Sequence, residues 1–170
     1  NNWFHNYEKR RNQLIQQQLK PEESLNCMVL PDEFEIDLVA HEPDIMNPID
    51  MTWDDRGRMF VAVTMDYPRI KKEGSDRVLL CEDKDGDGKA DSFTTFAEGF
   101  SLITGMCWVN GGLSLAQAPD MFFVKDTDGD DQADLYEKIN TGWGTNDTHG
   151  GPSNLRYGLD NKIYGCLGGG

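Results

Sequence analysis

The sequence lacks several features by which common protein classes are recognised. It has no apolar run of about 18 residues or more, the length that a membrane-spanning helix needs. Residues 1–13 also lack the apolar stretch of a signal peptide. We therefore expect a soluble globular region, from which any export leader has already been removed.

Cysteine is scarce, and the cysteines do not form a CxxC pair. They are Cys27, Cys81, Cys107 and Cys166. This spacing excludes the common zinc-binding and haem-attachment motifs within the chain. We interpret the cysteines most simply as buried thiols on strands, while one disulfide of unknown pairing stays open in an oxidising compartment.

Positive charge is also low. The 16 Lys and Arg stand against 30 Asp and Glu, which gives a net charge of −14. Such a chain repels nucleic acid phosphates and anionic lipid headgroups, so we expect neither nucleic acid nor a membrane surface as its partner. Membrane association would have to come from regions outside this chain, and cations are the partners that the charge favours.

The first 33 residues are predicted to form a helical extension. Apolar side chains recur at helical spacing over residues 3–20, and Pro21 ends that pattern. Pro21, followed by Glu22 and Glu23, suits the first turn of a second, short helix. We expect the extension to pack against the main domain.

From about residue 34 the pattern becomes that of β-strands. Apolar and polar residues alternate over 34–40, and three strand–turn–strand segments begin at residues 51, 106 and 155. Each of the first two is followed by a second hairpin with an acidic turn, and these turns start 43 residues apart. Four short strands that recur every ~40–50 residues are the period of β-propeller blades.

This period predicts an all-β fold in which residues 34–170 form the first blades of a β-propeller. Blade one should occupy about 48–98 and blade two about 102–141, while a third should begin near 153 and break off after two strands. A propeller ring closes with about four to eight blades, whereas these residues supply about 2.5. We therefore expect the chain to be part of a longer protein.

Each acidic turn matches the calcium-binding pattern DxDxDGxxD. Carboxylates at positions 1, 3, 5 and 9 and a backbone carbonyl at position 7 can point at one centre, and Ca²⁺ takes about six to eight such oxygen ligands. The ligands predicted in loop one (83–91) are Asp83, Asp85, Asp87, the Lys89 carbonyl and Asp91. Those predicted in loop two (126–134) are Asp126, Asp128, Asp130, the Gln132 carbonyl and Asp134.

Loop two departs from the pattern at its sixth position. Loop one has Gly88 there, which permits a sharp bend, whereas loop two has Asp131. Glu137 falls where a helical EF-hand has its last ligand, but the strand-like flanks favour a hairpin loop. Because such loops join strands within a blade, we expect the ions to be structural. The alternative is a pair of solvated Asp-Gly turns.

A glycine-rich segment, 141–152, leads into the third blade and contains His149, with Asp147 two residues earlier. An imidazole can accept a proton near neutral pH, and a nearby carboxylate can orient it. Loops that enter an inner strand lie near the central channel of a propeller, so His149 is the candidate general base and Asp147 its orienting partner. The alternative is a structural histidine that orders the loop. His5 and His41 have no such context and are interpreted as surface residues.

In combination, these motifs resemble a known protein family. The resemblance is to the N-terminal propeller of the membrane-bound dehydrogenases of Planctomycetes, Verrucomicrobia and Bacteroidetes, and it spans nearly all of residues 20–168. The residues that carry it are 20–25, 34–40, 53–58, 66–68, both acidic loops, 147–149 and 154–158. It implies an exported protein, periplasmic or extracellular and in some cases membrane-anchored, and many members carry a c-type haem domain downstream.

That family is in turn similar to soluble quinoprotein sugar dehydrogenases, propellers of about six blades that bind pyrroloquinoline quinone and Ca²⁺. The resemblance implies that His149 stands where those enzymes have the base that removes a hydroxyl proton as hydride passes to the quinone. One additional residue separates His149 from the hairpin that follows it. The expected function is oxidation of a sugar or related alcohol, with electrons passed to a quinone, a haem or an electron-transfer partner.

Two other function classes stay open. The chain can belong to a non-catalytic module that binds glycans or proteins through its loops, because a fold alone does not fix function. It can also belong to a metal-dependent, lactonase-like hydrolase, which would need a central cation held by Glu and Asn side chains.

Overall fold

The structure is a computed structural model that describes residues 19–68 and 73–168. The chain divides into two compact units, residues 1–38 and 39–170. In the first unit, α2 (Pro21–Leu25) confirms the predicted short helix, and the Glu23 carboxylate accepts a 3.2 Å hydrogen bond from the Lys20 amide. The helix predicted over residues 3–20 lies almost wholly outside the described residues. Within the described part of the chain, no helix is long and apolar enough to cross a membrane.

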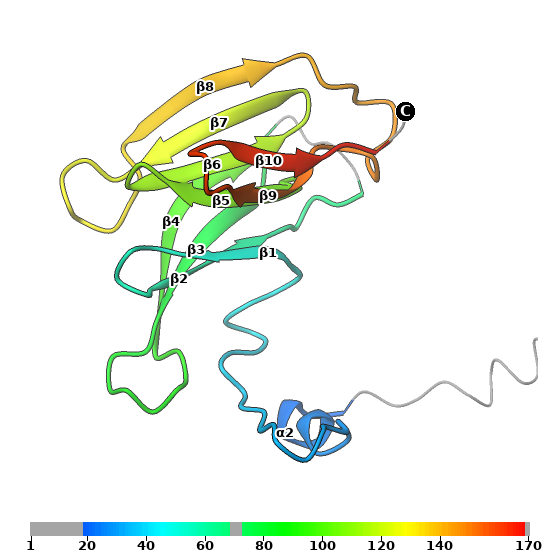
Figure 1. The fold of residues 1–170 in the computed structure, drawn as a ribbon, viewed down its shortest axis with the longest axis vertical. Coiled ribbons are helices and arrows are strands. Elements are labelled where there is room, and N and C mark those ends of the chain that lie inside the picture. The colour runs from blue at the N-terminus through cyan, green and yellow to red at the C-terminus, as the bar shows by residue number, and fades with distance from the viewer. Residues whose placement is uncertain (1–18, 69–72, 169–170) are drawn as a thin grey trace, which may run out of the picture. The chain divides into compact units, whose positions relative to one another are not determined.

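The second unit consists of two four-stranded antiparallel sheets and a two-stranded hairpin (Figure 1). The first sheet contains β1 (Pro48–Trp53), β2 (Met59–Val63), β3 (Asp76–Glu82) and β4 (Ser92–Phe100). The second sheet contains β5 (Gly105–Val109), β6 (Gly112–Gln117), β7 (Asp120–Lys125) and β8 (Leu135–Thr141). The hairpin consists of β9 (Ser153–Tyr157) and β10 (Ile163–Cys166). The all-β prediction is confirmed, and each predicted four-strand unit forms one sheet.

Residues 34–40 do not form a strand in this structure, contrary to the prediction from their alternation. No described strand pairs with them. Phe34 is 66% exposed and Val39 is 44% exposed. An isolated strand leaves its backbone groups without partners and buries little apolar surface, and alternation alone therefore does not hold it in place. The first strand of the unit begins at Pro48 instead.

The two sheets pack face to face through an apolar core. Phe60 on β2 stacks on Trp108 of β5 at 5.1 Å between ring centroids and meets Phe96 of β4 edge-on at 4.9 Å. On the opposite face of the second sheet, Cys107 and Leu155 pack together, which brings the hairpin against that sheet. Sheet, sheet and hairpin thus follow one another in an open succession.

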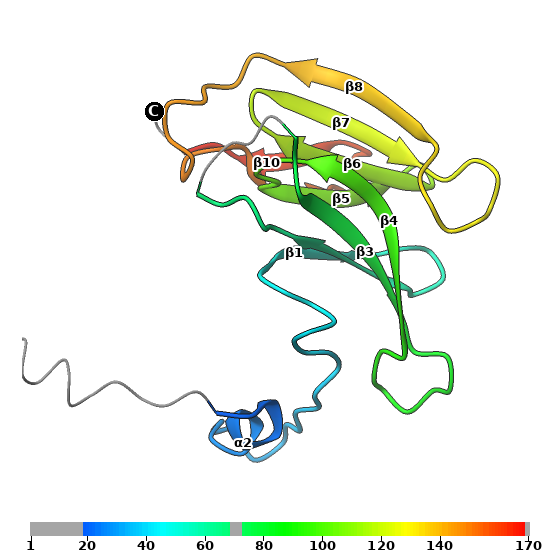
Figure 2. The ribbon, with the colours of Figure 1, turned by 180° about the vertical axis from the view of Figure 1, so that it is seen from behind.

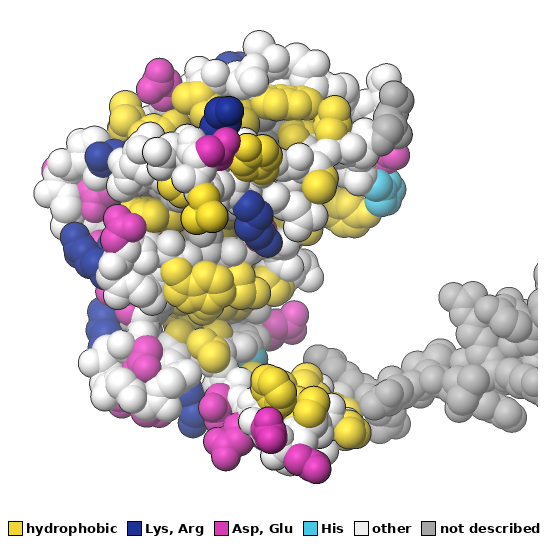
Figure 3. Space-filling model, viewed as in Figure 1, with side chains coloured by type: hydrophobic (Ala, Val, Ile, Leu, Met, Phe, Trp, Pro, Cys, Tyr) yellow, Lys and Arg dark blue, Asp and Glu magenta, His cyan; other side chains and the backbone are white. Residues whose placement is uncertain are grey.

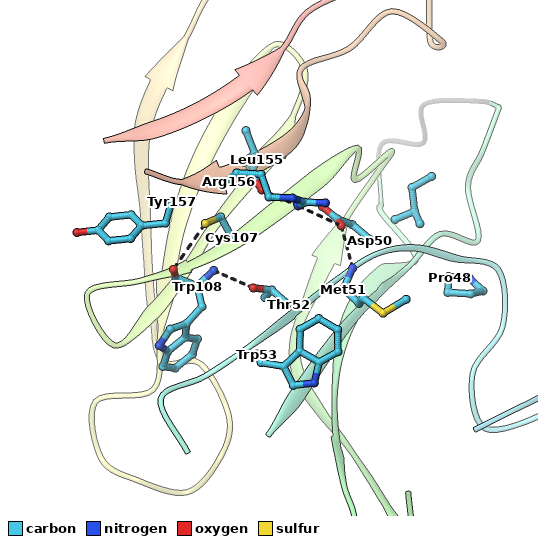
Figure 4. Close-up of a pocket in the computed structure, with 11 residues that line it drawn as sticks. Pro48, Asp50, Met51, Thr52, Trp53, Cys107, Trp108, Leu155, Arg156 and Tyr157 are labelled. Atoms are coloured by element: carbon cyan, nitrogen blue, oxygen red, sulfur yellow. Dashed lines mark hydrogen bonds and ion pairs between the residues drawn. The ribbon is translucent and has the colours of Figure 1, made fainter. Parts of the chain in front are cut away.

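The first strand of each element lies on one side of this succession. β1 lies beside β5, and β5 lies beside β9. The Asp50 carboxylate accepts a 2.9 Å hydrogen bond from the Met106 amide, and the Thr52 hydroxyl accepts one of 3.3 Å from the Trp108 amide. Figure 4 shows the Thr52 contact. Both bonds span 56 positions, so β1 and β5 run in the same direction and in a fixed register.

The described cysteines are free thiols. Cys81 on β3 and Cys107 on β5 are buried, as predicted. Cys27 and Cys166 are exposed, contrary to the prediction of buried thiols, because Cys27 follows the short α2 and Cys166 ends a hairpin that packs on one face only. His41 is exposed, as predicted, and His5 lies outside the described residues.

Connections alternate between the two ends of each sheet, because every strand is antiparallel to the next. The β1–β2 turn and the β3–β4 loop therefore lie at one end, and the β2–β3 and β4–β5 connections lie at the other. Since β1 and β5 run in the same direction, loop one and loop two extend from the same end of the two sheets (Figure 2).

Candidate metal-binding loops and histidine pocket

Loop one brings three of its carboxylates together. Oxygen atoms of Asp83, Asp85 and Asp91 lie within 4.8 Å of one another. In loop two the corresponding group is Asp126, Asp128 and Asp130, whose oxygen atoms meet the same limit. Both groups could hold a metal ion. Figure 2 shows each loop as a rounded segment beyond the ends of its two strands.

Backbone amides fold loop one around its first aspartate. Asp83 accepts hydrogen bonds from the amides of Gly86 at 2.7 Å, Asp87 at 3.2 Å and Gly88 at 2.8 Å. Asp91, at the end of the loop, accepts one of 3.0 Å from the amide of Lys84. The first and last carboxylates are thereby fixed on the same side of the turn.

Loop two repeats this hydrogen-bond pattern despite its different sixth residue. Asp126 accepts bonds of 2.6 Å from the Gly129 amide and 2.9 Å from the Asp131 amide, and Asp134 accepts one of 2.9 Å from the Thr127 amide. Asp131 has φ of 66°, and Gly88 at the same position of loop one has φ of 87°. Asp is among the residues that tolerate this left-handed conformation, so the loop keeps its shape without the glycine.

The spacing of the carboxylate oxygens fits a calcium ion. Two oxygens that bind one Ca²⁺ at about 2.3–2.6 Å cannot be more than about 5.2 Å apart. The 4.8 Å limit observed in each group satisfies this condition. The same spacing also suits other cations that bind oxygen ligands.

Four of the predicted ligands lie outside these two groups. In loop one Asp87 accepts a 2.9 Å hydrogen bond from the Lys89 amide, and in loop two Asp134 accepts a 2.5 Å bond from the Thr127 hydroxyl. Lys89 and Gln132 lie at the seventh position of their loops, where ligation by their carbonyl oxygens stays a prediction. The carboxylates that the structure brings together are thus those of positions 1 and 3 in both loops, with position 9 in one and position 5 in the other.

The amides that surround these carboxylates favour their charged forms. The amides of Gly88, Gly86 and Asp87 lower the pKa of Asp83. For Asp126, partial desolvation opposes ionisation, but the amides of Gly129 and Asp131 outweigh it and lower the pKa. The hydroxyl and amide of Thr127 lower the pKa of Asp134. The loops therefore present negative charge at neutral pH, as a cation site requires.

Loop two is attached to the neighbouring sheet through its backbone. The Ala133 amide donates a 2.7 Å hydrogen bond to the carbonyl of Phe96, which lies at a β-bulge of β4. A bulge leaves its extra residue outside the ladder, so the carbonyl is free to accept from the loop. In loop one, Ala90 makes the equivalent 2.9 Å bond to the carbonyl of Val39.

An arginine to which the sequence assigned no role of its own, Arg58, links loop two to the first sheet. Arg58 donates from Nε to Asp54 at 2.8 Å and from Nη1 to Asp131 at 2.6 Å, and Nη1 lies 3.8 Å from Glu82. Burial opposes ionisation of Asp54, but Arg58 and the turn amides lower its pKa. The signal available in the sequence was the run of Asp and Arg from 54 to 58.

His149 and Asp147 lie at the other end of the sheets. His149 Nδ1 is 2.9 Å from Asp147 Oδ1, and the His149 amide donates to the same oxygen at 2.9 Å. These contacts lower the pKa of Asp147. The predicted pair is therefore brought together. Tyr67 meets the imidazole edge-on at 5.7 Å.

A cavity of about 280 Å³ lies beside His149. It is lined by Ile49, Thr64, Tyr67, Leu102, Ile103, Thr104, Thr148, His149, Gly151 and Ser153. Most of these residues come from the β2–β3, β4–β5 and β8–β9 connections, and Ile49 and Ser153 lie at the starts of β1 and β9. The cavity and the acidic loops are therefore at opposite ends of the sheets. Ions in the loops would not touch His149.

A buried carboxylate that the sequence analysis missed supports this cavity. Asp76 is fully buried and accepts hydrogen bonds from the Thr64 hydroxyl at 2.9 Å and from the amides of Met65 at 2.7 Å and Ile103 at 3.0 Å. It thereby ties together two connections that line the cavity. Its sequence signal is weak, since a single Asp at the start of a β-strand can have many roles.

In a comparison with models of known protein families, one family's model matches residues 20–169. That family is described as a domain of unknown function, DUF7133, and the chain belongs to it. No curated protein and no solved structure matches the chain.

Proposed function

We propose that this member of the DUF7133 family binds Ca²⁺ in loop one and loop two, as structural ions of a β-propeller. The observation that carries the proposal is shared by two loops 43 residues apart: backbone amides bond to the first aspartate in the same way, and three carboxylates, including those of positions 1 and 3, converge in each loop. Two unrelated solvated turns would not need to share these features. Hard oxygen ligands of this kind suit Ca²⁺ better than softer metals.

The propeller is supported by the way the sheets follow one another. Each sheet is a four-stranded antiparallel meander, and the first strands of successive elements are neighbours. One face of the second sheet packs on the first sheet, and its other face packs on the hairpin. Radial repetition of such sheets is the architecture of a propeller. About six blades, of which two sheets and one hairpin lie in this chain, remain the proposal that the family resemblance favours.

A structural role for the ions is supported by the position of the loops. Loop two bonds through Ala133 to Phe96 of the neighbouring sheet, and its Asp131 pairs with Arg58 of that sheet. An ion that fixes the loop would therefore also fix the contact between sheets. The His149 cavity is at the opposite end.

Chelation and loop variants test the calcium proposal. Removing Ca²⁺ should lower the melting temperature, because an ion that binds only the folded state stabilises it by about 2.7 kcal/mol at a hundredfold excess over Kd. Asp85→Ala should lower it in part and should reduce the effect of the chelator. Asp44→Ala, an exposed site outside the loops, is the matched control. Identical melting curves with and without Ca²⁺ would refute the proposal.

We propose, as a second function, that a sugar or related alcohol binds in the cavity beside His149 and is oxidised there. His149 accepts the hydroxyl proton of this substrate. The observation that favours it is the 2.9 Å contact between His149 Nδ1 and Asp147. A carboxylate at Nδ1 selects the tautomer in which Nε2 can accept a proton, and it stabilises the imidazolium that forms. Export and a downstream electron acceptor, either a haem domain or a partner protein, are proposed from the family resemblance.

The residues described here do not by themselves fit pyrroloquinoline quinone. That cofactor carries several carboxylates, whereas the residues that line the His149 cavity include no Lys or Arg. We therefore derive from this chain only the proton-accepting role of His149. Residues that would hold a quinone belong to other blades in this proposal.

His149→Ala in the full-length protein tests the second function. Loss of a general base should reduce alcohol-dependent dye reduction by about 10²–10⁴-fold. His41→Ala, at an exposed histidine, is the matched control and should leave the rate unchanged. Undiminished dye reduction in His149→Ala would contradict the proposal. Saturable glycan or protein binding without turnover would favour the non-catalytic module, and lactone opening without an electron acceptor would favour the hydrolase.

A further inference from the structure

The two sheets present matching faces, one covered and one open. Each sheet has one face toward the sheet or hairpin that follows it in the chain. We call the opposite face its upstream face. On the second sheet this face carries Met106, Trp108, Leu113, Leu115, Val124 and Ala133, and it packs on the first sheet. On the first sheet the equivalent residues are Met51, Trp53, Met59, Val61, Cys81 and Ala90.

Burial differs sharply between the first strands of these two faces, whereas Val61 and Cys81 on the inner strands of the open face are buried. Met106 is fully buried and Trp108 stacks on Phe60, because the first sheet covers them. Met51 is 48% exposed and Trp53 is 52% exposed. Figure 3 shows hydrophobic side chains gathered over the region of β1. Along β1, the upstream face of the first sheet thus has the residues of a sheet–sheet interface, but no sheet covers them.

The open face contains a groove where a further sheet would lie. Its volume is about 600 Å³, and Val39, Trp53, Met59, Cys81 and Ala90 are among the residues that line it. The corresponding space between the two sheets is smaller, at about 300 Å³, and is lined in part by Phe96 and Trp108. Val39 and Trp53 therefore line the open groove in the same way that Phe96 and Trp108 line the space between the sheets.

The backbone gives the same equivalence independently. The Ala133 amide bonds to the carbonyl of Phe96, which belongs to the fourth strand of the preceding sheet. The Ala90 amide makes its matching bond to the carbonyl of Val39. Val39 thus occupies the place of a bulge residue in the fourth strand of a sheet that would precede the first.

We propose that the segment 34–41 is the outermost strand of a further sheet, which packs on the upstream face of the first sheet and closes the ring. The other three strands of that sheet come from the same polypeptide. The alternating apolar residues of 34–40 then acquire the hydrogen-bonding edge that they lack here. This inference rests on the propeller of the proposed function, and it adds where the ring closes and which residues close it.

Oxidative footprinting of the full-length protein tests the closure. Hydroxyl radicals oxidise exposed Met and Trp side chains, and mass spectrometry reports the rate at each site. If the ring closes as proposed, Met51 should react as slowly as Met106, at least about tenfold more slowly than exposed Met65. Trp53 should likewise match Trp108. Reaction of Met51 and Trp53 at the rate of Met65 would overturn the proposal.

Two further measurements separate closure from its alternatives. Val39→Asp should raise the oxidation rate of Met51, whereas Val29→Asp, at a residue that is 96% exposed, should not. Protection of Met51 that disappears on dilution, with a dimer seen by light scattering, would show that a second copy covers the face and would overturn the intramolecular closure. Calcium titration of the same samples reports on the loops separately, so the two proposals can fail independently.

Discussion

Arg58 Nη1 donates a 2.6 Å hydrogen bond to Asp131 Oδ1 across 73 positions of sequence. Asp131 is the residue that breaks the glycine pattern of loop two, and this contact gives a reason for the break. A glycine would adopt the same φ of 66° with less strain, but it would have no carboxylate to offer Arg58. Asp131 therefore adopts a left-handed conformation that glycine would adopt more easily, and its carboxylate links the two sheets.

A double-mutant cycle tests this link. Arg58→Ala should destabilise the fold by about 1.5–3 kcal/mol, because it leaves Asp54 buried without its charged partner. Asp131→Gly should cost less, since the carboxylate is 41% exposed and glycine relieves the strained φ. The coupling free energy between the two sites, measured by urea unfolding, should be about 1 kcal/mol. Strictly additive effects would show that the contact contributes nothing to stability.

Gly88 in loop one should resist substitution for a conformational reason alone. Its φ is 87°, and an added Cβ would meet no atom within 4 Å, so only the left-handed backbone opposes a side chain. Gly88→Ala should lower the free energy of unfolding by about 1–2 kcal/mol. Gly144→Ala, which also meets open space but has no positive φ, is the control and should be close to neutral. Equal costs at the two sites would contradict the assigned loop geometry.

Acid should weaken the fold through Asp54. Its pKa in the folded state lies below the ordinary value of 3.8, so the stability that its ionised form contributes is fully present above that value. The contribution is lost as pH falls through 3.8 towards the lower folded-state pKa. The free energy of unfolding, measured with chelator present, should therefore drop below about pH 4, and Asp54→Asn should flatten that drop. An equally steep drop in the variant would assign the acid sensitivity to other groups.

The four thiols should separate into two reactivity classes. Burial raises the pKa of Cys81 to about 11 and also raises the pKa of Cys107, so few thiolates form at either site at pH 8. Cys27 and Cys166 are exposed and should react with a maleimide in the folded protein. Labelling followed by mass spectrometry should find Cys81 and Cys107 modified only in urea. Early labelling of Cys81 would contradict the packing of the first sheet.

Local signals in the sequence predicted most of the strands. The period of the turns located both sheets and the hairpin, and Pro21 marked α2, because these features depend on residues close together in the chain. The alternation over 34–40 gives no strand in this structure, since a strand also needs an edge supplied by another part of the chain.

The candidate site divides in the same way. The Asp pattern identified both loops, and the spacing of Asp147 and His149 identified their contact. The roles of Arg58, Asp76 and Val39 could not be predicted, because each depends on a partner that only the packing brings near. Asp131 is the clearest case, since the sequence marked it as a defect and the structure gives it a partner.

Equilibrium calcium binding tests the central claim most directly. The account predicts that the protein, freed of metal and titrated with Ca²⁺, binds one ion in each loop, and that Asp83→Ala and Asp126→Ala each remove one of the two sites and leave the other. Asp44→Ala should keep both sites. Absence of binding at millimolar Ca²⁺, or binding that both loop variants leave unchanged, would contradict the account.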